Sequence, residues 1–249
     1  MILYGRNPVA EALRGRRAHT VQEVWAGAGA LREPWLKRAQ ARGVRVRAAS
    51  AAGIERRCGS AAHQGVCAEA GAYPYVPSTA LLACPEPLVL ALDQVQDPHN
   101  LGSICRTAEC AGAAGVVIPE RRAAAVTPAV CKASAGAVEH LAVAQVRNVA
   151  DFLAEARGAG CWCYGASPRA RASGPQPVPY DVPDYRGSGI VLVLGGEASG
   201  LRPRVAGACD QLICLPLLGQ SESLGVAAAA AALVYGILQR RAWRVDKNP

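Results

Sequence analysis

The segment PLVLALDQVQDPHNLGSICRTAECAGAAGVVIP, residues 87–119, contains the order of elements that decides the fold. It begins with an apolar run, passes through a polar turn, continues with a helix-like stretch and ends in a second apolar run, GVVIP. Apolar runs of this kind are typical of strands that are buried on both faces. A helix between two such strands is the usual crossover of a parallel sheet, so the segment predicts a strand–helix–strand unit.

The same alternation continues along the rest of the chain. Further apolar runs are HLAVAQV, CWCYGAS, GIVLVLGG and QLICLPL, which begin at residues 140, 161, 189 and 211. Helix-like stretches lie between most of them. We therefore expect an α/β domain with a mainly parallel sheet covered by helices.

The first part of the chain differs in charge and predicts a second, smaller α/β unit. Residues 1–70 hold twelve Arg and Lys against five Asp and Glu, a balance of +7, whereas residues 71–249 hold fifteen against fourteen. Asn7 and Pro8 are typical of a helix start. The concentration of positive charge favours a module that binds RNA or another polyanion, with a solvated basic face as the alternative.

A proline-bearing connector separates the two units, so we expect a basic N-terminal domain at 1–72, a linker at 73–86 and a second domain at 87–249. No apolar run reaches the ~18–20 residues of a membrane span, and the N-terminus lacks the pattern of an export signal. These features predict a cytoplasmic protein. The ten cysteines include no CxxC pair, so we expect them to be core residues and expect no metal site.

Three polar or glycine-rich turns are predicted to meet at one edge of the parallel sheet, because ligands of open α/β sheets gather at the carboxyl ends of the strands. The turns are DPHN at 97–100, GGEASGLRP at 195–203 and PLLGQSESLG at 216–225. The first turn leads into a helix that carries Arg106. The spacing of GGEASG fits neither a dinucleotide nor a phosphate-loop motif, so the glycines alone leave turn structure and ligand binding open.

These turns resemble the three signature motifs of the SpoU (TrmH) family of S-adenosyl-L-methionine-dependent RNA ribose 2′-O-methyltransferases. The stretches ILYGRNPVAEAL at 2–13 and HQGV at 63–66 resemble the substrate-binding domain of the 23S rRNA guanosine-2′-O-methyltransferase subgroup (the RlmB type). The resemblance spans almost the whole chain. It departs from the family at the third motif, where Ser-Leu-Asn is usual and this chain has Ser223-Leu224-Gly225.

The resemblance implies a fold, a cofactor and an oligomeric state. The expected fold is a C-terminal SPOUT domain with a trefoil knot, preceded by a small ribosomal-protein-like RNA-binding domain. The expected cofactor is S-adenosyl-L-methionine, and the expected partner is RNA. Because the family is dimeric, we also expect a homodimer with the last helix, at about 221–241, in its interface.

The resemblance also implies roles for individual residues. The predicted catalytic residues are Arg106, Asn100, Glu197 and Ser223. The predicted cofactor-binding residues are Gly195, Leu215, Leu224, Glu197 and Leu218. The charge balance adds Arg6, Arg14, Arg16 and Arg17 as predicted RNA-binding residues.

Arg106 is expected to grip a phosphate and stabilise the forming alkoxide, because a guanidinium with a pKa above ~12 is a poor proton acceptor. Asn100 is expected to orient Arg106 or the ribose, and Ser223 to position the substrate phosphate. Simpler interpretations stay open. Asn100 and Ser223 are also suitable helix caps, and Glu197 is a suitable structural hydrogen-bond acceptor.

The sequence thus predicts methyl transfer to a ribose 2′-hydroxyl, with a guanosine of 23S rRNA as the expected target. One alternative keeps the chemistry but changes the target to tRNA. Another is an RNA-binding protein with reduced or lost catalysis, because Gly225 lacks the amide of the usual asparagine. The basic N-terminal domain favours rRNA, since the tRNA-modifying relatives are usually shorter at that end.

Overall fold

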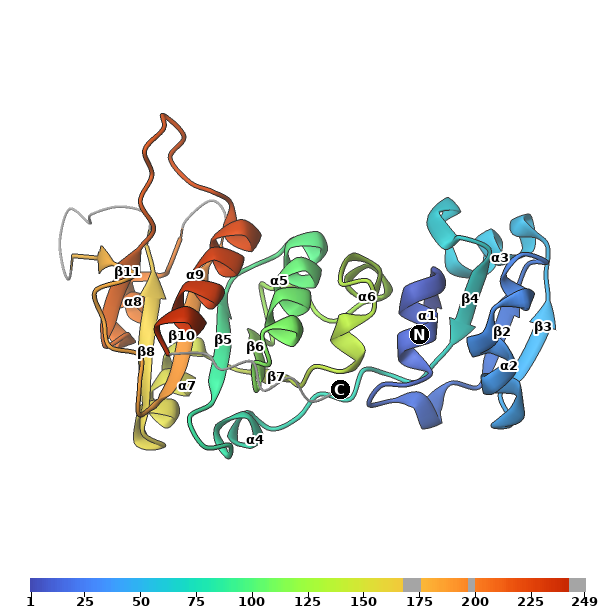
Figure 1. Cartoon of the computed structure of the whole chain (residues 1–249), viewed down its shortest axis with the longest axis horizontal. Helices are drawn as coiled ribbons and strands as arrows, with labels where there is room; N and C mark the ends of the chain where they lie inside the picture. The colour runs from blue at the N-terminus through green and yellow to red at the C-terminus, as the bar shows by residue number, and fades with distance from the viewer. Residues whose placement is uncertain (168–175, 197–199, 242–249) are drawn as a thin grey trace.

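The computed structural model describes residues 1–167, 176–196 and 200–241, and its strands form two separate sheets (Figure 1). The N-terminal sheet has the order β1-β4-β2-β3, and the C-terminal sheet has the order β7-β6-β5-β10-β8-β11-β9. The two sheets are successive along the chain, which agrees with the two α/β units expected from the sequence.

The N-terminal sheet is mixed, because β4 is antiparallel to β1 and β2 while β2 is parallel to β3. Side chains on one face of this sheet, such as Leu3 and Val24, are buried in one apolar cluster with Val9 and Leu36 of the covering helices. The elements are β1 (Ile2–Tyr4), α1 (Arg6–Ala12), β2 (Glu23–Ala26), α2 (Pro34–Ala41), β3 (Arg45–Ala48), α3 (Ala51–Cys58) and β4 (Val66–Glu69).

Helix α1 begins earlier than Asn7 and Pro8 indicate. Its N-cap is Gly5, with φ 97° and ψ 150°, and Asn7 lies inside the helix. Glycine reaches this conformation easily because it has no Cβ atom. A Cβ at Gly5 would also lie 2.6 Å from Nζ of Lys132, which belongs to the C-terminal half.

Each neighbouring pair of described strands in the C-terminal sheet is parallel, so the prediction of a mainly parallel sheet is confirmed. Its strands are β5 (Leu88–Asp93), β6 (Gly115–Pro119), β7 (Val143–Val146), β8 (Cys161–Ala166), β9 (Val178–Pro179), β10 (Gly189–Gly195) and β11 (Gln211–Cys214). Its helices are α4 (Ser78–Leu82), α5 (Pro98–Cys110), α6 (Pro128–Ala133), α7 (Val149–Gly158), α8 (Pro203–Ala208) and α9 (Val226–Arg240), with the short turn η4 (Ala137–Glu139) after α6.

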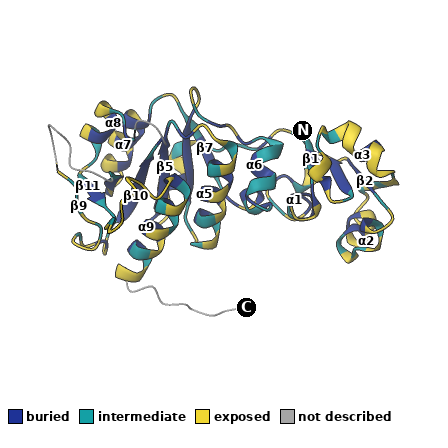
Figure 2. Ribbon diagram, turned by 90° about the horizontal axis from the view of Figure 1, so that it is seen from above, coloured by how far each residue is buried: buried dark blue, intermediate teal, exposed yellow. Residues whose placement is uncertain are grey.

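Helices cover both faces of this sheet. In Figure 2 the strands are buried, and the outer faces of the helices on either side are exposed. The side chains of β5 alternate between two apolar clusters. Leu90 and Leu92 share a cluster with Leu101 of α5, whereas Val89 shares the other with Phe152 of α7. This two-sided burial explains why the strands appear in the sequence as continuous apolar runs.

The connector predicted at 73–86 packs along the C-terminal domain. The backbone N–H of Val76 donates to the carbonyl of Val143 at 3.0 Å, and the backbone N–H of Val126 donates to the hydroxyl of Tyr75 at 2.8 Å. Leu81 of α4 is buried in the cluster beneath α7. The boundaries 1–72, 73–86 and 87–249 stay a prediction.

All ten cysteines are free thiols. Five are buried as expected, but Cys84 and Cys110 are exposed. Burial raises the pKa of Cys105 to about 12, so this thiol is protonated at neutral pH. Within the described ranges, no group of His, Cys, Asp and Glu side chains is arranged to share a metal ion. No helix in those ranges combines the length and apolarity that crossing a membrane requires.

Candidate active site

Three turns lie at one edge of the C-terminal sheet. Strands β5, β10 and β11 share one direction through their parallel pairings, so their carboxyl ends lie on the same side. Each of these ends leads through a turn into a helix, namely α5, α8 and α9. Figure 1 shows the turn before α9 rising above this edge. The structure therefore brings the three motif segments to one place.

The second turn is closed so tightly that a side chain at its first position has no room. A Cβ at Gly195 would lie 2.2 Å from the carbonyl carbon of Gly200. The backbone N–H of Gly200 donates to the carbonyl of Gly196 at 3.0 Å. A Cβ at Gly196 would lie 2.7 Å from the carbonyl oxygen of Gln94, so the second turn touches the chain directly after β5. Because neither glycine has a Cβ, the backbone at residues 195 and 196 packs directly against Gly200 and Gln94.

A buried carboxylate ties the end of β5 to the second turn. Asp93, the last residue of β5, is fully buried. Its side chain accepts hydrogen bonds from the backbone N–H of Arg202 at 2.9 Å and from Nε of Arg202 at 2.7 Å. Arg202 also approaches the same carboxylate through Nη2, at 2.7 Å. Because a buried carboxylate needs such partners, Asp93 and Arg202 position the end of the glycine turn.

The sequence interpretation missed this pair. An ionisable residue directly after a buried apolar run was the available signal for Asp93. Nothing in the local sequence indicates its partner, which lies 109 residues further along the chain.

Asn100 and Arg106 lie on α5, but they do not form a pair. The N-cap of this helix is Asp97, whose side chain accepts from the backbone N–H of His99 at 2.9 Å. Asn100 is therefore not the cap, and the simpler interpretation of this residue was wrong. Six positions along a helix separate two residues by about 9 Å along the axis and about 120° around it, so the direct orientation of Arg106 by Asn100 is not favoured.

The side chain of Arg106 is available to a ligand. It is exposed on α5, and within the described part of the chain it makes no hydrogen bond and no ion pair. A guanidinium in this state is suited to binding a phosphate or a developing negative charge.

The third turn offers apolar side chains to solvent. Leu215 packs partly against the core, whereas Leu218 and Leu224 are 98% and 52% exposed. Ser223 is also exposed. Ser223 does not cap α9, because the N-cap is Gly225 and makes no side-chain bond. Exposed leucines beside polar groups are typical of a binding surface. Glu197, predicted for both catalysis and cofactor binding, lies outside the described residues.

Gly225 adopts a backbone conformation that almost only glycine populates, with φ 77° and ψ 147°. We expect Gly225→Ala to lower the free energy of unfolding by about 1–3 kcal/mol, measured by urea unfolding. Gly219→Ala in the same turn is the matched control. A Cβ has open space at both positions, but Gly219 has no positive φ, so its change should stay below about 1 kcal/mol. Equal losses in the two variants would contradict this explanation.

Three of the four predicted RNA-binding arginines are exposed. Arg6 and Arg14 form surface ion pairs with Glu33 and Glu11, each at 3.0 Å, and Arg16 is exposed. The prediction for Arg17 was wrong. Its side chain is completely buried and paired with a carboxylate of the C-terminal half, so it offers no charge to an RNA on the surface.

Comparison with known proteins identifies two family matches. Residues 87–235 match the SpoU rRNA Methylase family, and residues 2–76 match the family described as RNA 2′-O ribose methyltransferase substrate binding. A curated relative, the putative TrmH family tRNA/rRNA methyltransferase YacO of Bacillus subtilis (strain 168), is 41% identical over 188 residues, which are 72% of this chain and 71% of the relative. The 23S rRNA (guanosine-2′-O-)-methyltransferase RlmB of Xanthomonas axonopodis pv. citri (strain 306) is 37% identical over 248 residues, 96% of each chain.

Solved structures agree with these matches. The AdoMet-bound rRNA methyltransferase from Sinorhizobium meliloti aligns with a TM-score of 0.78 and 25% identity, covering 96% of this chain and 86% of that chain. The SpoU methyltransferase AviRb from Streptomyces viridochromogenes aligns with a TM-score of 0.79, covering 97% and 90% of the two chains. Its 21% identity supports the fold alone.

The chain belongs to the SpoU rRNA methylase family. It is an RNA methyltransferase that uses S-adenosylmethionine, so the resemblance of the sequence to that family is confirmed.

Proposed function

We propose that this enzyme methylates the ribose 2′-hydroxyl of a guanosine in 23S rRNA. The observation that carries the proposal is the 37% identity, over 96% of each chain, to a relative named for that reaction. The guanidinium of Arg106 is exposed and unpaired within the described residues, so it can bind a phosphate of the RNA.

The residues at the sheet edge fit S-adenosylmethionine. An adenine has apolar faces and a polar edge, so it needs apolar side chains and backbone hydrogen-bonding groups. Leu215, Leu218 and Leu224 offer apolar surface, and we assign the backbone hydrogen-bonding groups to the glycine turn at Gly195. When bound, the cofactor supplies a methyl group on a positively charged sulfur. We assign its binding to these four residues, with Glu197 as a further candidate.

Arg106 is assigned the catalytic role of stabilising negative charge on the attacking ribose oxygen. A ribose hydroxyl is a very weak acid, so attack on the methyl carbon requires loss of its proton or stabilisation of the developing oxyanion. As the oxygen–carbon bond forms, the bond between that carbon and sulfur breaks. A guanidinium does not take up the proton, so we assign the proton to a phosphate oxygen or a water molecule. Asn100 and Ser223 are assigned to positioning the ribose and its phosphate.

The target class is tested by incubating the enzyme with methyl-labelled S-adenosylmethionine and, separately, with large-subunit rRNA, small-subunit rRNA and tRNA. Label in large-subunit rRNA is the expected result. Labelling of tRNA would replace the target with the tRNA alternative. The absence of label in all three would favour an RNA-binding protein without catalysis.

The exposed arginines of the N-terminal domain are proposed to contact RNA phosphates. Replacing Arg6, Arg14 and Arg16 together by Gln should weaken RNA binding and flatten the slope of log K against log salt by about 2, because each lost phosphate contact removes about 0.7 for a single strand. Binding measured by fluorescence anisotropy at several salt concentrations checks this. Arg186→Gln, which removes a surface arginine paired with Asp184, should leave the slope unchanged. An unchanged slope in the triple variant would contradict the assignment.

We also propose a homodimer with α9 in the interface. Leu233 and Ile237 are buried on the inner face of this helix, while Ala228, Ala232 and Tyr235 are exposed on another face. Small side chains on an exposed face permit close packing of a second helix. Light scattering coupled to size-exclusion chromatography should give the mass of a dimer at micromolar concentration, and the mass of a monomer would contradict it. The trefoil knot and the cytoplasmic location are proposed from family membership.

A further inference from the structure

The N-terminal and C-terminal domains are joined by a buried ion pair. Nε and Nη2 of Arg17 donate to the two carboxylate oxygens of Glu139 at 2.8 and 2.6 Å. Arg17 follows α1, and Glu139 ends η4 of the C-terminal domain, 122 residues away. Neither side chain has any exposed surface. We call these two residues the interdomain pair.

The remaining donors of Arg17 also have acceptors. Nη1 donates to the carbonyl of Gly71 at 3.0 Å and to the sulfur of Met1 at 3.3 Å, and Nη2 lies 3.4 Å from the sulfur of Cys131. The guanidinium carbon lies 5.6 Å from the centre of the Tyr73 ring. Burial alone lowers the pKa of Arg17, but the bond and charge of Glu139 outweigh it and the pKa is raised. The arginine therefore stays charged, and each N–H of its guanidinium has an acceptor.

The backbones of the two domains also touch around this pair. The backbone N–H of Arg16 donates to the carbonyl of Glu139 at 2.8 Å. A Cβ at Gly15 would lie 2.4 Å from that carbonyl oxygen. Gly136, with φ +89°, lies so close to α1 that a Cβ added to it would be 2.7 Å from Cβ of Glu11. The two domains are therefore in direct backbone contact at these positions.

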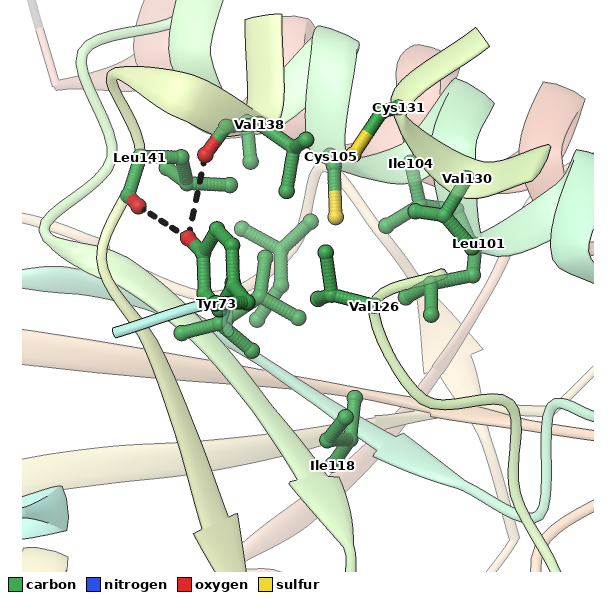
Figure 3. Packing of buried hydrophobic residues seen from close by; sticks show 14 of the residues in the cluster. Tyr73, Leu101, Ile104, Cys105, Ile118, Val126, Val130, Cys131, Val138 and Leu141 are labelled. Carbon is green, nitrogen blue, oxygen red and sulfur yellow. Dashed lines mark hydrogen bonds between the residues drawn. The ribbon is translucent and has the colours of Figure 1, made fainter. Parts of the chain in front are cut away.

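Tyr73 fixes the chain where it passes from one domain to the next. Its hydroxyl lies 3.0 Å from the carbonyl of Val138 and 2.6 Å from that of Leu141, on either side of Glu139 (Figure 3). Figure 3 also shows its ring among apolar side chains that include Cys105 and Val126. The connector is thus anchored at the same place as the interdomain pair.

A buried ion pair adds little net stability compared with apolar residues of similar size, but it has a strict directional geometry. Two parallel hydrogen bonds between a planar guanidinium and a carboxylate allow one relative orientation. We propose that Arg17 and Glu139 are positioning residues that hold the N-terminal domain in one orientation to the C-terminal domain, whose helix α5 carries Arg106. RNA held by the exposed arginines then lies at a fixed distance from Arg106. This inference rests on the function proposed above.

The orientation is tested first on the unmodified enzyme. Small-angle X-ray scattering is measured at ~0.1 M and ~1 M NaCl, where the screening length falls from about 10 Å to about 3 Å. A buried pair is screened much less than a surface pair, so we expect the same scattering profile at both concentrations, with each protomer of the proposed dimer in the domain arrangement of Figure 1. A profile that expands at high salt, or that requires several domain arrangements at both, would overturn the proposal.

Glu139→Gln tests the role in catalysis. The variant keeps the size of the side chain but leaves the charge of Arg17 without its partner. A loosened domain lowers the effective concentration of the RNA at the second site, so we expect KM for large-subunit rRNA to rise about tenfold, with kcat and the Kd of S-adenosylmethionine changed less than about twofold. The scattering profile should also expand. A folded variant with native KM and native scattering would overturn the proposal.

Two further variants support the interpretation. Asp151→Asn breaks a 2.7 Å ion pair with Arg204 that is exposed and lies within the C-terminal domain, so it should change neither KM nor scattering. If Glu139→Gln does not fold, the test uses Arg17→Lys instead, because lysine keeps the charge but lacks the planar guanidinium. A rise in KM and an expanded scattering profile are again expected, and native values of both would overturn the proposal.

The positioning role and the proposed function fail in different ways. If the unmodified enzyme methylates no RNA, the proposed function is wrong, while the scattering measurements still decide the domain orientation. If Glu139→Gln methylates large-subunit rRNA with native KM, only the positioning role is wrong.

Discussion

Arg106→Met is expected to lower kcat for RNA methylation by about 10²–10³-fold, the loss typical of removing one group that stabilises a developing oxyanion. Methionine keeps much of the length and apolar stem of arginine but has no charge to offer the ribose oxygen. Because Arg106 makes no hydrogen bond or ion pair within the described part of the chain, its replacement should leave the unfolding midpoint nearly unchanged. The measurement is single-turnover transfer of labelled methyl groups to large-subunit rRNA, whose rate constant should fall by the same factor, together with kcat from multiple turnovers.

Two comparisons make this test specific. The Kd of S-adenosylmethionine should stay within about threefold, because the role assigned to Arg106 is with the substrate oxygen and not with the cofactor. Arg186→Met removes an exposed arginine that is paired with Asp184, and it should retain the native rate. An Arg106→Met enzyme with a native single-turnover rate would remove Arg106 from the mechanism.

Asp93→Asn is expected to weaken both the fold and the cofactor site. Asparagine keeps the size of the side chain but cannot neutralise Arg202, which loses its ion pair. We expect the free energy of unfolding to fall by about 2 kcal/mol, less than the ~3–5 kcal/mol of a fully buried pair, because the Arg202 side chain is 38% exposed and can turn to water. The measurement is urea unfolding.

The same variant should raise the Kd of S-adenosylmethionine about tenfold, because loss of the Arg202 anchor is equivalent to about 1.4 kcal/mol at the glycine turn. Isothermal titration calorimetry measures this. Asp151→Asn is the control, since Asp151 pairs at 2.7 Å with Arg204, only two residues beyond Arg202, but both side chains are exposed. Equal effects of the two substitutions on cofactor affinity would show that Asp93 does not position the turn.

The C-terminal sheet could be predicted because its strands are buried on both faces. Strands β5 and β10 are continuous apolar runs with a glycine or polar turn at each end, and this pattern is specific enough to locate them within a few residues. Short elements were harder. Strand β1 has three residues and β9 has two, and such lengths carry no periodicity.

Site residues could be predicted where they lie close together in the sequence, and they could not be predicted where their partners lie far away. Arg106 lies inside the motif that follows Asp97, and its exposure agrees with the predicted role. Arg17 looked like one more basic residue of the N-terminal domain, because its charge partner Glu139 is 122 residues away. Total charge says how many basic residues a segment holds, but only tertiary packing decides which of them reach the solvent.

The methyl group is expected to go to a ribose oxygen and not to a base. Large-subunit rRNA labelled by the enzyme and S-adenosylmethionine is hydrolysed in alkali, which cleaves next to every free 2′-hydroxyl but not next to a methylated one. We predict that the label is recovered in alkali-resistant dinucleotides that begin with guanosine. Label recovered in mononucleotides, as base methylation would give, would contradict ribose methylation.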